Sequence, residues 1–128
     1  MRHISTSSAR SFFKVLISTR AAQAAMMTLR PGQSSSQEVE NEHPRCEQWC
    51  YVISGAGRAT VGKRSVALKP GSLLLIEKNE PHRVTNTSRK VLVTLNLYCP
   101  PAYTDQGEVK LLSRVPTLAS ALKLKRLA

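Results

Sequence analysis

The 128-residue sequence is poor in aromatic residues and in cysteines, and it has few acidic residues for its number of basic ones. Two Phe, three Tyr and one Trp make up 5% of the chain, too few for the rows of rings on which proteins stack single-stranded nucleic acid. No stretch approaches the roughly 20 apolar residues that cross a bilayer, and the first residues lack the compact apolar core of a secretory signal. We therefore expect neither specific nucleic-acid binding nor a membrane-spanning segment.

The three cysteines, Cys46, Cys50 and Cys99, form no C-x-x-C pair. Cys46 and Cys50 lie four positions apart in a segment that we expect to be extended, so at about 3.3 Å per residue they are too distant to bridge. In a reducing compartment all three should remain thiols. The sequence also contains no P-loop and no dinucleotide-binding fingerprint.

The scarcity of acidic residues gives the chain a formal net charge of +11, from 19 Lys or Arg and 8 Asp or Glu. Residues 1–37 carry five basic residues and no acid, and residues 110–128 carry five more and no acid. The middle, residues 38–109, has nine basic and eight acidic residues, so its net charge is +1. Binding of a polyanion through the two ends is therefore a hypothesis, and it predicts only salt-sensitive, non-specific attraction.

The N-terminal segment has two interpretations. Residues 1–20 are rich in Arg and Ser and free of acids, as mitochondrial transit peptides are. Alternatively, FFKVLIST and AAQAAMMTLRPG are the first two strands of a barrel, and only residues 1–11 form a tail. We expect the second interpretation and a cytoplasmic protein, with a mitochondrial location as the alternative.

Short apolar runs separated by Gly, Pro, Asn and Ser are typical of an all-β antiparallel sandwich or barrel, and 128 residues with 41% apolar content suffice for one domain. Only the end of the chain, PTLASALKLKRLA from Pro116, has a helical pattern, and about ten residues make a marginal helix alone. The expected strands are Phe12–Thr19, Ala25–Leu29, Trp49–Ile53, Arg58–Val61, Ser65–Leu68, Leu73–Ile76, His82–Val84 and Val91–Tyr98.

Two glycine-framed segments that contain histidines carry a family resemblance. In KPGSLLLIEKNEPHRVTN, Gly71, Glu77, Asn79, His82 and Asn86 stand where the pattern G(x)5PxG(x)2H(x)3N has Gly, Pro, Gly, His and Asn. This pattern is one of the two motifs of the cupin superfamily, which the chain resembles from Phe12 to Glu108. More closely, it looks like small single-domain bacterial cupins of the cupin 2, RmlC-like type.

The other cupin motif, G(x)5HxH(x)3-4E(x)6G, is matched less fully by RPGQSSSQEVENEHPRCEQWCYVISGAG. His43 takes the place of the second His, Gln48 the place of the Glu, and Asn41 the place of the first His. The resemblance implies a double-stranded β-helix, or jelly-roll, barrel over residues 12–108. It leaves a flexible N-terminal tail, 1–11, and a basic C-terminal tail, 109–128, with at most a short helix.

The resemblance places His43, Gln48 and His82 around one point, with Asn41 as a fourth donor. Two imidazoles suit a divalent ion such as Zn, Fe, Ni or Mn, whereas neutral amide oxygens would hold it weakly. Alternatively, a one-residue bulge would turn the carboxylate of Glu47 inward and give a site of two His and one carboxylate.

Other side chains near these motifs have ordinary interpretations. We expect Glu42 to lie on a solvated strand face and Tyr103 to anchor the barrel edge. Trp49 and Tyr51 alternate with Gln48 and Cys50, so they should lie on the outer face. Because cupins of this size commonly pair through an N-terminal strand and the outer sheet face, we expect a homodimer, with Trp49 and Tyr51 as candidates for the buried contact.

The function that this reading supports is a small cupin that binds a divalent metal and a small anionic or oxygenated ligand. A dioxygenase, an isomerase or a lyase would fit, and no Ser-His-Asp set or paired carboxylates choose among them. The alternative is a non-catalytic cupin that binds or senses a small molecule without metal.

Overall fold

The computed structural model describes residues 1–7 and 10–105, and this part of the chain is all-β. The expected basic C-terminal tail, 109–128, and the short helix from Pro116 lie outside the described residues. Within the described residues there is no helix with the length and apolar character that crossing a membrane requires.

Each of the eight apolar runs that the sequence separates by turn residues forms one strand. The strands are β1 (Phe13–Ser18), β2 (Gln23–Leu29), β3 (Glu47–Ser54), β4 (Gly57–Val61), β5 (Arg64–Leu68), β6 (Leu73–Ile76), β7 (His82–Thr85) and β8 (Leu92–Cys99). The all-β prediction is therefore confirmed. Strand β1, which lies within the residues 1–20 of the transit-peptide interpretation, pairs with β2.

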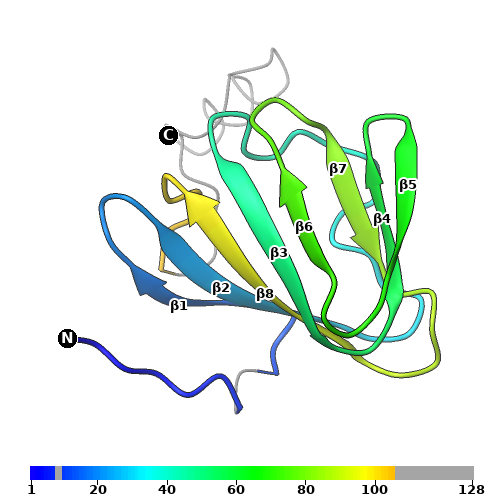
Figure 1. The fold of residues 1–128 in the computed structure, drawn as a ribbon, viewed down its shortest axis with the longest axis horizontal. Coiled ribbons are helices and arrows are strands. Elements are labelled where there is room, and N and C mark those ends of the chain that lie inside the picture. Colours follow the sequence, from blue (N-terminus) through cyan, green and yellow to red (C-terminus); the bar gives the residue numbers. More distant parts are fainter. Residues whose placement is uncertain (8–9, 106–128) are drawn as a thin grey trace, which may run out of the picture.

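The strands form two antiparallel sheets (Figure 1). The larger sheet has the order β1-β2-β8-β3-β6, and the smaller has the order β5-β4-β7. Buried apolar side chains from both sheets meet between them and form the core: Met27, Leu29, Val52, Ala59, Leu68, Val84 and Leu92. This is the jelly-roll arrangement that the two motifs imply.

The turn between β6 and β7 explains why the second motif is matched with an Asn in place of a Gly. Asn79 has a φ of 67°, in the left-handed region that the motif's glycine would adopt without strain. Asn tolerates this region better than most residues do. Asn86, at the end of the same motif, is fully buried, and its Nδ2 donates to the carbonyl oxygens of Leu29 and Lys90.

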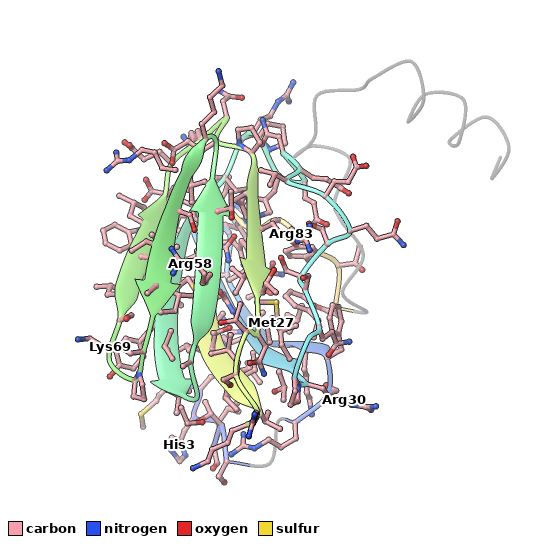
Figure 2. The ribbon with its side chains drawn as sticks, turned by 90° about the vertical axis from the view of Figure 1, so that its right-hand side faces the viewer. His3, Met27, Arg30, Arg58, Lys69 and Arg83 are labelled. Carbon is pink, nitrogen blue, oxygen red and sulfur yellow. The ribbon has the colours of Figure 1, made fainter. Side chains whose placement is uncertain are left out.

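A segment without regular strand structure, residues 33–43, runs beside the free edge of β7. Isolated bridges pair Ser34 with Thr85 and Glu40 with His82. Arg83 adds side-chain hydrogen bonds from the outer side of β7, to the carbonyl oxygen of Gln37 at 2.8 Å and to Ser34 at 3.1 Å (Figure 2). The segment therefore extends the smaller sheet irregularly and ends beside the first residue of β7.

Gly55 is the position where the backbone approaches most closely. Its φ is 84°, and a Cβ atom there would lie 2.3 Å from the carbonyl oxygen of Val91. Gly32 has a similar φ of 80°, but a Cβ atom there would meet nothing within 4 Å. Substitutions at these two glycines therefore distinguish the effect of backbone strain from the effect of a steric clash.

We predict that Gly55→Ala lowers the free energy of unfolding by roughly 3 kcal/mol or more, because the strain is joined by a clash with backbone atoms. Gly32→Ala, which introduces the strain alone, should cost about 1 to 2 kcal/mol. Urea unfolding followed by tryptophan fluorescence measures both values. Equal losses in the two variants would contradict the close approach at Gly55.

Candidate metal and ligand site

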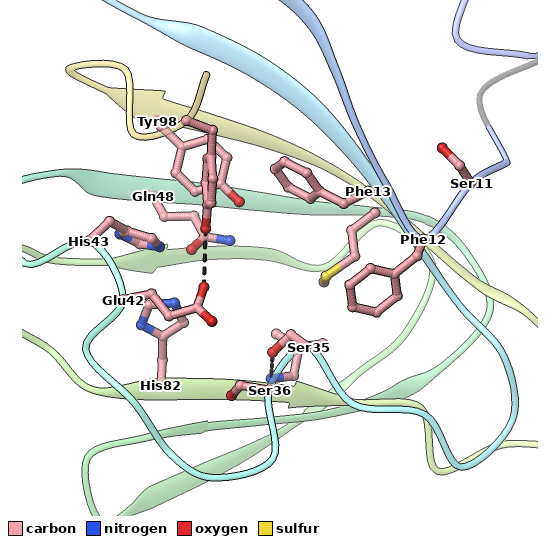
Figure 3. Close-up of a pocket in the computed structure, with 13 residues that line it drawn as sticks. Ser11, Phe12, Phe13, Ser35, Ser36, Glu42, His43, Gln48, His82 and Tyr98 are labelled. Atoms are coloured by element: carbon pink, nitrogen blue, oxygen red, sulfur yellow. Dashed lines mark hydrogen bonds between the residues drawn. The ribbon is translucent and has the colours of Figure 1, made fainter. Parts of the chain in front are cut away.

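A cavity of about 460 Å³ lies between the larger sheet and β7 (Figure 3). Its lining divides into a polar end and an apolar end, with the histidines at the first and the phenylalanines at the second. The lining residues are Ser11, Phe12, Phe13, Met27, Ser35, Ser36, Glu42, His43, Gln48, His82, Val84, Tyr98 and Tyr103.

Three of the four predicted donors meet at the polar end. Gln48 comes from β3, His82 begins β7, and His43 follows the bridge between Glu40 and His82. The ring centroids of His43 and His82 lie 4.8 Å apart, and both side chains are buried. The fold therefore brings together residues that lie up to 39 positions apart in the chain.

The fourth predicted donor, Asn41, does not join them. It is exposed and does not line the cavity. The prediction assumed that Asn41 and His43 alternate along a strand, but residues 41–46 are a turn-rich connection in which the period of two does not hold. The neighbouring Glu42 lines the cavity instead, so the expectation that it lies on a solvated strand face is wrong.

Glu47 also stays outside the cavity. No bulge occurs at its position, and its Oε1 accepts a hydrogen bond from Trp49 Nε1 at 3.1 Å. Gln48, Cys50 and Val52 are buried as the alternation predicts. Burial raises the pKa of Cys50 to about 12, so this thiol stays protonated and is a poor metal ligand.

The orientation of the Gln48 amide is fixed by a chain of buried hydrogen bonds. Its Nε2 donates to Asn96 Oδ1 at 2.9 Å, and Asn96 Nδ2 donates to Thr94 Oγ1 at 3.0 Å. With Nε2 committed to Asn96, the amide oxygen Oε1 is the Gln48 atom left to interact with His43. It is buried and no hydrogen bond of good geometry reaches it from the described residues, which is a costly state for a carbonyl oxygen.

The two histidines differ in their surroundings. His82 Nδ1 lies 2.9 Å from the carbonyl oxygen of Glu80. Since a carbonyl oxygen only accepts, Nδ1 carries the proton, and in the neutral ring Nε2 keeps a lone pair for a ligand. Burial, and after it the neighbouring His82, lowers the pKa of His43 from 6.5 to about 4, although hydrogen bonding to its own backbone and then to Gln48 opposes this. His43 is therefore uncharged at neutral pH.

The carboxylate of Glu42 is held by an aromatic cluster. Tyr103 donates its hydroxyl proton to Glu42 Oε2 at 3.2 Å, and the Tyr103 ring packs against Phe13 and Tyr98 at 4.7 and 5.0 Å between centroids. Burial, followed by the charge of Glu42, raises the pKa of Tyr103 well above its ordinary value. The phenol therefore remains a hydrogen-bond donor.

The donor set fits a weakly held divalent ion. Within residues 1–7 and 10–105, no three His, Cys, Asp or Glu side chains gather closely enough to hold a metal. An ion would therefore need the unsatisfied Gln48 Oε1 as its third donor, with His43 and His82 as the other two. Because an amide oxygen and the lone pairs of neutral imidazoles carry no charge, the ion would keep its full charge.

Sequence reasoning missed several residues that line the cavity. Phe12 and Phe13 were expected only as part of a strand, Glu42 as a solvated residue and Tyr103 as an anchor at the barrel edge. Their place in the cavity depends on contacts between segments far apart in the sequence, for which the sequence carries no local signal. The sequence does show that the chain has only six aromatic residues, and four of them line this cavity.

We predict that acid destabilises the metal-free protein through His43. The unfolded chain binds a proton at His43 below pH 6.5, whereas the folded chain does not until about pH 4. Stability is therefore complete above pH 6.5 and falls as the pH drops toward 4, by up to about 3 kcal/mol. Urea unfolding in EDTA at several pH values measures the slope. His43→Gln should flatten this part of the profile, and an unchanged slope would contradict the prediction.

Comparison with known proteins agrees with this fold. The family model described as "Cupin domain" matches residues 25–98, more than half of the chain. No curated protein matches the sequence significantly. The solved structure of BH2720 from Bacillus halodurans is 25% identical, with a TM-score of 0.71 over 81% of this chain and 80% of the other.

Two further structures are similar in fold. A protein with a double-stranded β-helix domain from Klebsiella pneumoniae subsp. pneumoniae is 20% identical, with a TM-score of 0.67 over 78% of this chain and 90% of that one. A protein described as a predicted oxalate decarboxylase from Thermotoga maritima is 22% identical, with a TM-score of 0.61 over 70% and 79%. The family match, the two sheets and the paired motifs together identify this chain as a member of the cupin family.

Proposed function

We propose that this cupin binds a divalent metal ion, Zn, Fe, Ni or Mn, through His43, Gln48 and His82, and a small-molecule ligand beside it in the same cavity. The observation that carries the proposal is the Gln48 amide oxygen, which is buried, is the Gln48 atom left to interact with His43 and is unsatisfied among the described residues. A cation would satisfy this oxygen and the ring lone pairs at once. Chemically, a bound metal would polarise an oxygen of the ligand as a Lewis acid.

The remaining side chains would bind and orient the ligand. The hydroxyls of Ser35 and Ser36 line the polar part of the cavity, and the rings of Phe12 and Phe13 offer an apolar wall. The chemistry of such a site would suit a dioxygenase, an isomerase or a lyase. The lining among the described residues contains no Lys or Arg, so an anionic ligand would find no positive side chain to pair with.

A non-catalytic cupin that binds a small molecule without metal is the second candidate. It is supported by the two changes in the first motif, Asn41 for His and Gln48 for Glu, which leave no charged metal ligand. In this case, the Gln48 amide oxygen would accept a hydrogen bond from the ligand itself. The cavity and its lining would be the same, so metal binding separates the two candidates.

We predict that metal-free protein binds Zn²⁺ at one equivalent in calorimetric titration and that His82→Ala weakens this binding by roughly 100-fold. Gln48→Glu should strengthen it about tenfold or more, because a carboxylate adds a full charge beside the ion. Glu47→Gln, on the other face of β3, is the matched control and should bind as the wild type does. Zinc binding by Gln48→Glu but not by the wild type would favour the metal-free candidate.

We further propose that a second copy of the chain covers the outer face of the larger sheet. Two rows of side chains without charge cross four strands of this face. The rows are Leu75, Trp49, Leu97 and Ala24, and Leu73, Tyr51, Leu95 and Met26, of which Met26 is already fully buried within the chain. A chain with a net charge of +11 repels its own copies wherever basic residues meet, so these two uncharged rows are where two copies fit best.

We predict that light scattering after gel filtration gives about twice the mass of 14.1 kDa at micromolar concentration. Leu73→Glu places like charges opposite each other in a symmetric pair and should yield monomers. Val66→Glu, a similarly exposed apolar position on β5 of the other sheet, is the control and should leave the mass unchanged. A monomeric wild type would rule the dimer out.

A further inference from the structure

The connections that follow β2, β3, β5 and β7 all begin at the same pole of the barrel, the lower side of Figure 1. Asn86 ties several of them together. Its Nδ2 donates to the carbonyl oxygens of Leu29, at the end of β2, and of Lys90, before β8, and its own carbonyl oxygen accepts from Gly32 N. These connections therefore form one continuous surface.

The charges of the described residues divide between this pole and the opposite one. Arg30, Lys69, Arg89 and Lys90 lie in the connections of the first pole and are exposed, and these connections contain no acidic residue. Figure 2 shows Arg30 and Lys69 extending outward in the lower part of the view. We call the surface that carries these four residues the basic pole.

The acidic residues of positions 1–7 and 10–105 lie toward the other pole. They follow β6 and β8, begin β3, or belong to the part of segment 33–43 that approaches the start of β7, and they are Glu38, Glu40, Glu42, Glu47, Glu77, Glu80 and Asp105. The predicted metal donors His43, Gln48 and His82 are at this acidic pole as well. An anionic surface therefore attracts one pole of the barrel and repels the other.

The connections of the basic pole are held by backbone and short side chains. Ser88 donates to Asn86 Oδ1 from its backbone N at 2.9 Å and from its hydroxyl at 2.8 Å. Lys69 N donates to Ser72 Oγ at 3.0 Å, and Ser72 N donates to the carbonyl oxygen of Lys69 at 2.9 Å. None of these hydrogen bonds uses an ammonium group. The charge of the pole can therefore be changed without removing the bonds that shape it.

Exposed apolar side chains lie beside these cations. Val91, next to Lys90, is 43% exposed, and Phe12 is 45% exposed. Phe12 belongs to the same pole because its carbonyl oxygen accepts from Thr28 N, two residues before Arg30. Apolar side chains gain from burial only if the partner offers an apolar environment. A phosphate backbone offers none, whereas the boundary between lipid headgroups and acyl chains does.

We propose that the basic pole binds the surface of a lipid bilayer that contains anionic lipids. The four cations would lie at the anionic headgroups, and Val91 and the exposed part of Phe12 would enter the headgroup layer. Each cation close to such a surface strengthens binding about fivefold. The proposal goes beyond the proposed function and does not depend on it, because the metal donors lie at the opposite pole.

The test measures co-sedimentation with vesicles of phosphatidylcholine that contain about 30% phosphatidylserine. We expect the wild type to bind these vesicles and to bind pure phosphatidylcholine vesicles about tenfold more weakly or less. Because salt screens the attraction, about 0.5 M salt should release most of the bound protein.

Lys69→Gln combined with Lys90→Gln should weaken binding about 25-fold, since two attractive charges are lost. Lys63→Gln combined with Lys78→Gln is the matched control. These two lysines are exposed in the turns of the opposite pole, and their loss changes the net charge equally, so binding should stay within about threefold of the wild type. Val91→Ser leaves the charge unchanged and should weaken vesicle binding about threefold.

A wild type that does not bind the anionic vesicles would overturn the proposal. An equal loss in the two double variants would also overturn it, because the attraction would then come from charges elsewhere in the chain, such as the five basic residues of positions 110–128. Binding to a DNA duplex that is tighter than binding to the vesicles, together with no effect of Val91→Ser on the vesicles, would assign the surface to nucleic acid instead.

Discussion

Two backbone hydrogen bonds between Glu40 and His82 hold the cavity together. They fasten the irregular segment 33–43 to the free edge of β7, and they do so beside the residues that face the cavity. Glu42 and His43 follow Glu40 directly, so their side chains reach the space that His82 reaches from the strand. Without this pairing, the segment would be attached to β7 only through Ser34, Ser35 and the side chain of Arg83, farther along the segment from Glu42 and His43.

The resulting cavity has a polar end, which holds the histidines, and an apolar end, which holds the phenylalanines. At one end lie uncharged donor atoms, whose side chains are oriented by hydrogen bonds to their other polar atoms. The chain of hydrogen bonds from Gln48 to Asn96 and Thr94 is an example. At the other end, the ring of Phe13 packs against those of Tyr98 and Tyr103. Glu42 lies where the two ends meet, so a ligand that fills the cavity would touch a donor for its oxygen, a carboxylate and an apolar wall.

The sequence allowed the strands to be predicted because each is bounded by turn residues whose conformational preferences are local. Gly55 and Asn79, for example, have the positive φ angles that their positions in the motifs suggest. His43, Gln48 and His82 could be predicted because the family pattern records which residues converge. Asn41 was misplaced, and Glu42 was missed, because the rule of alternating faces applies only to strands and residues 41–46 are not one. The role of Tyr103 depends on Gln23, 80 positions away, and no local pattern reports such a contact.

Gln23 accepts backbone hydrogen bonds from Ala102 and Tyr103 and donates one to Tyr103, all with a single buried amide. One side of the cavity is thus attached to the sheet by a side chain and not by a strand ladder. Local opening in proteins follows such attachments, since they break without disturbing the cooperative core. Replacement of this one amide would therefore remove the hydrogen bonds that fix the backbone of Tyr103, and with them the position of the hydroxyl that donates to Glu42, without removing any hydrogen bond of the strand ladders.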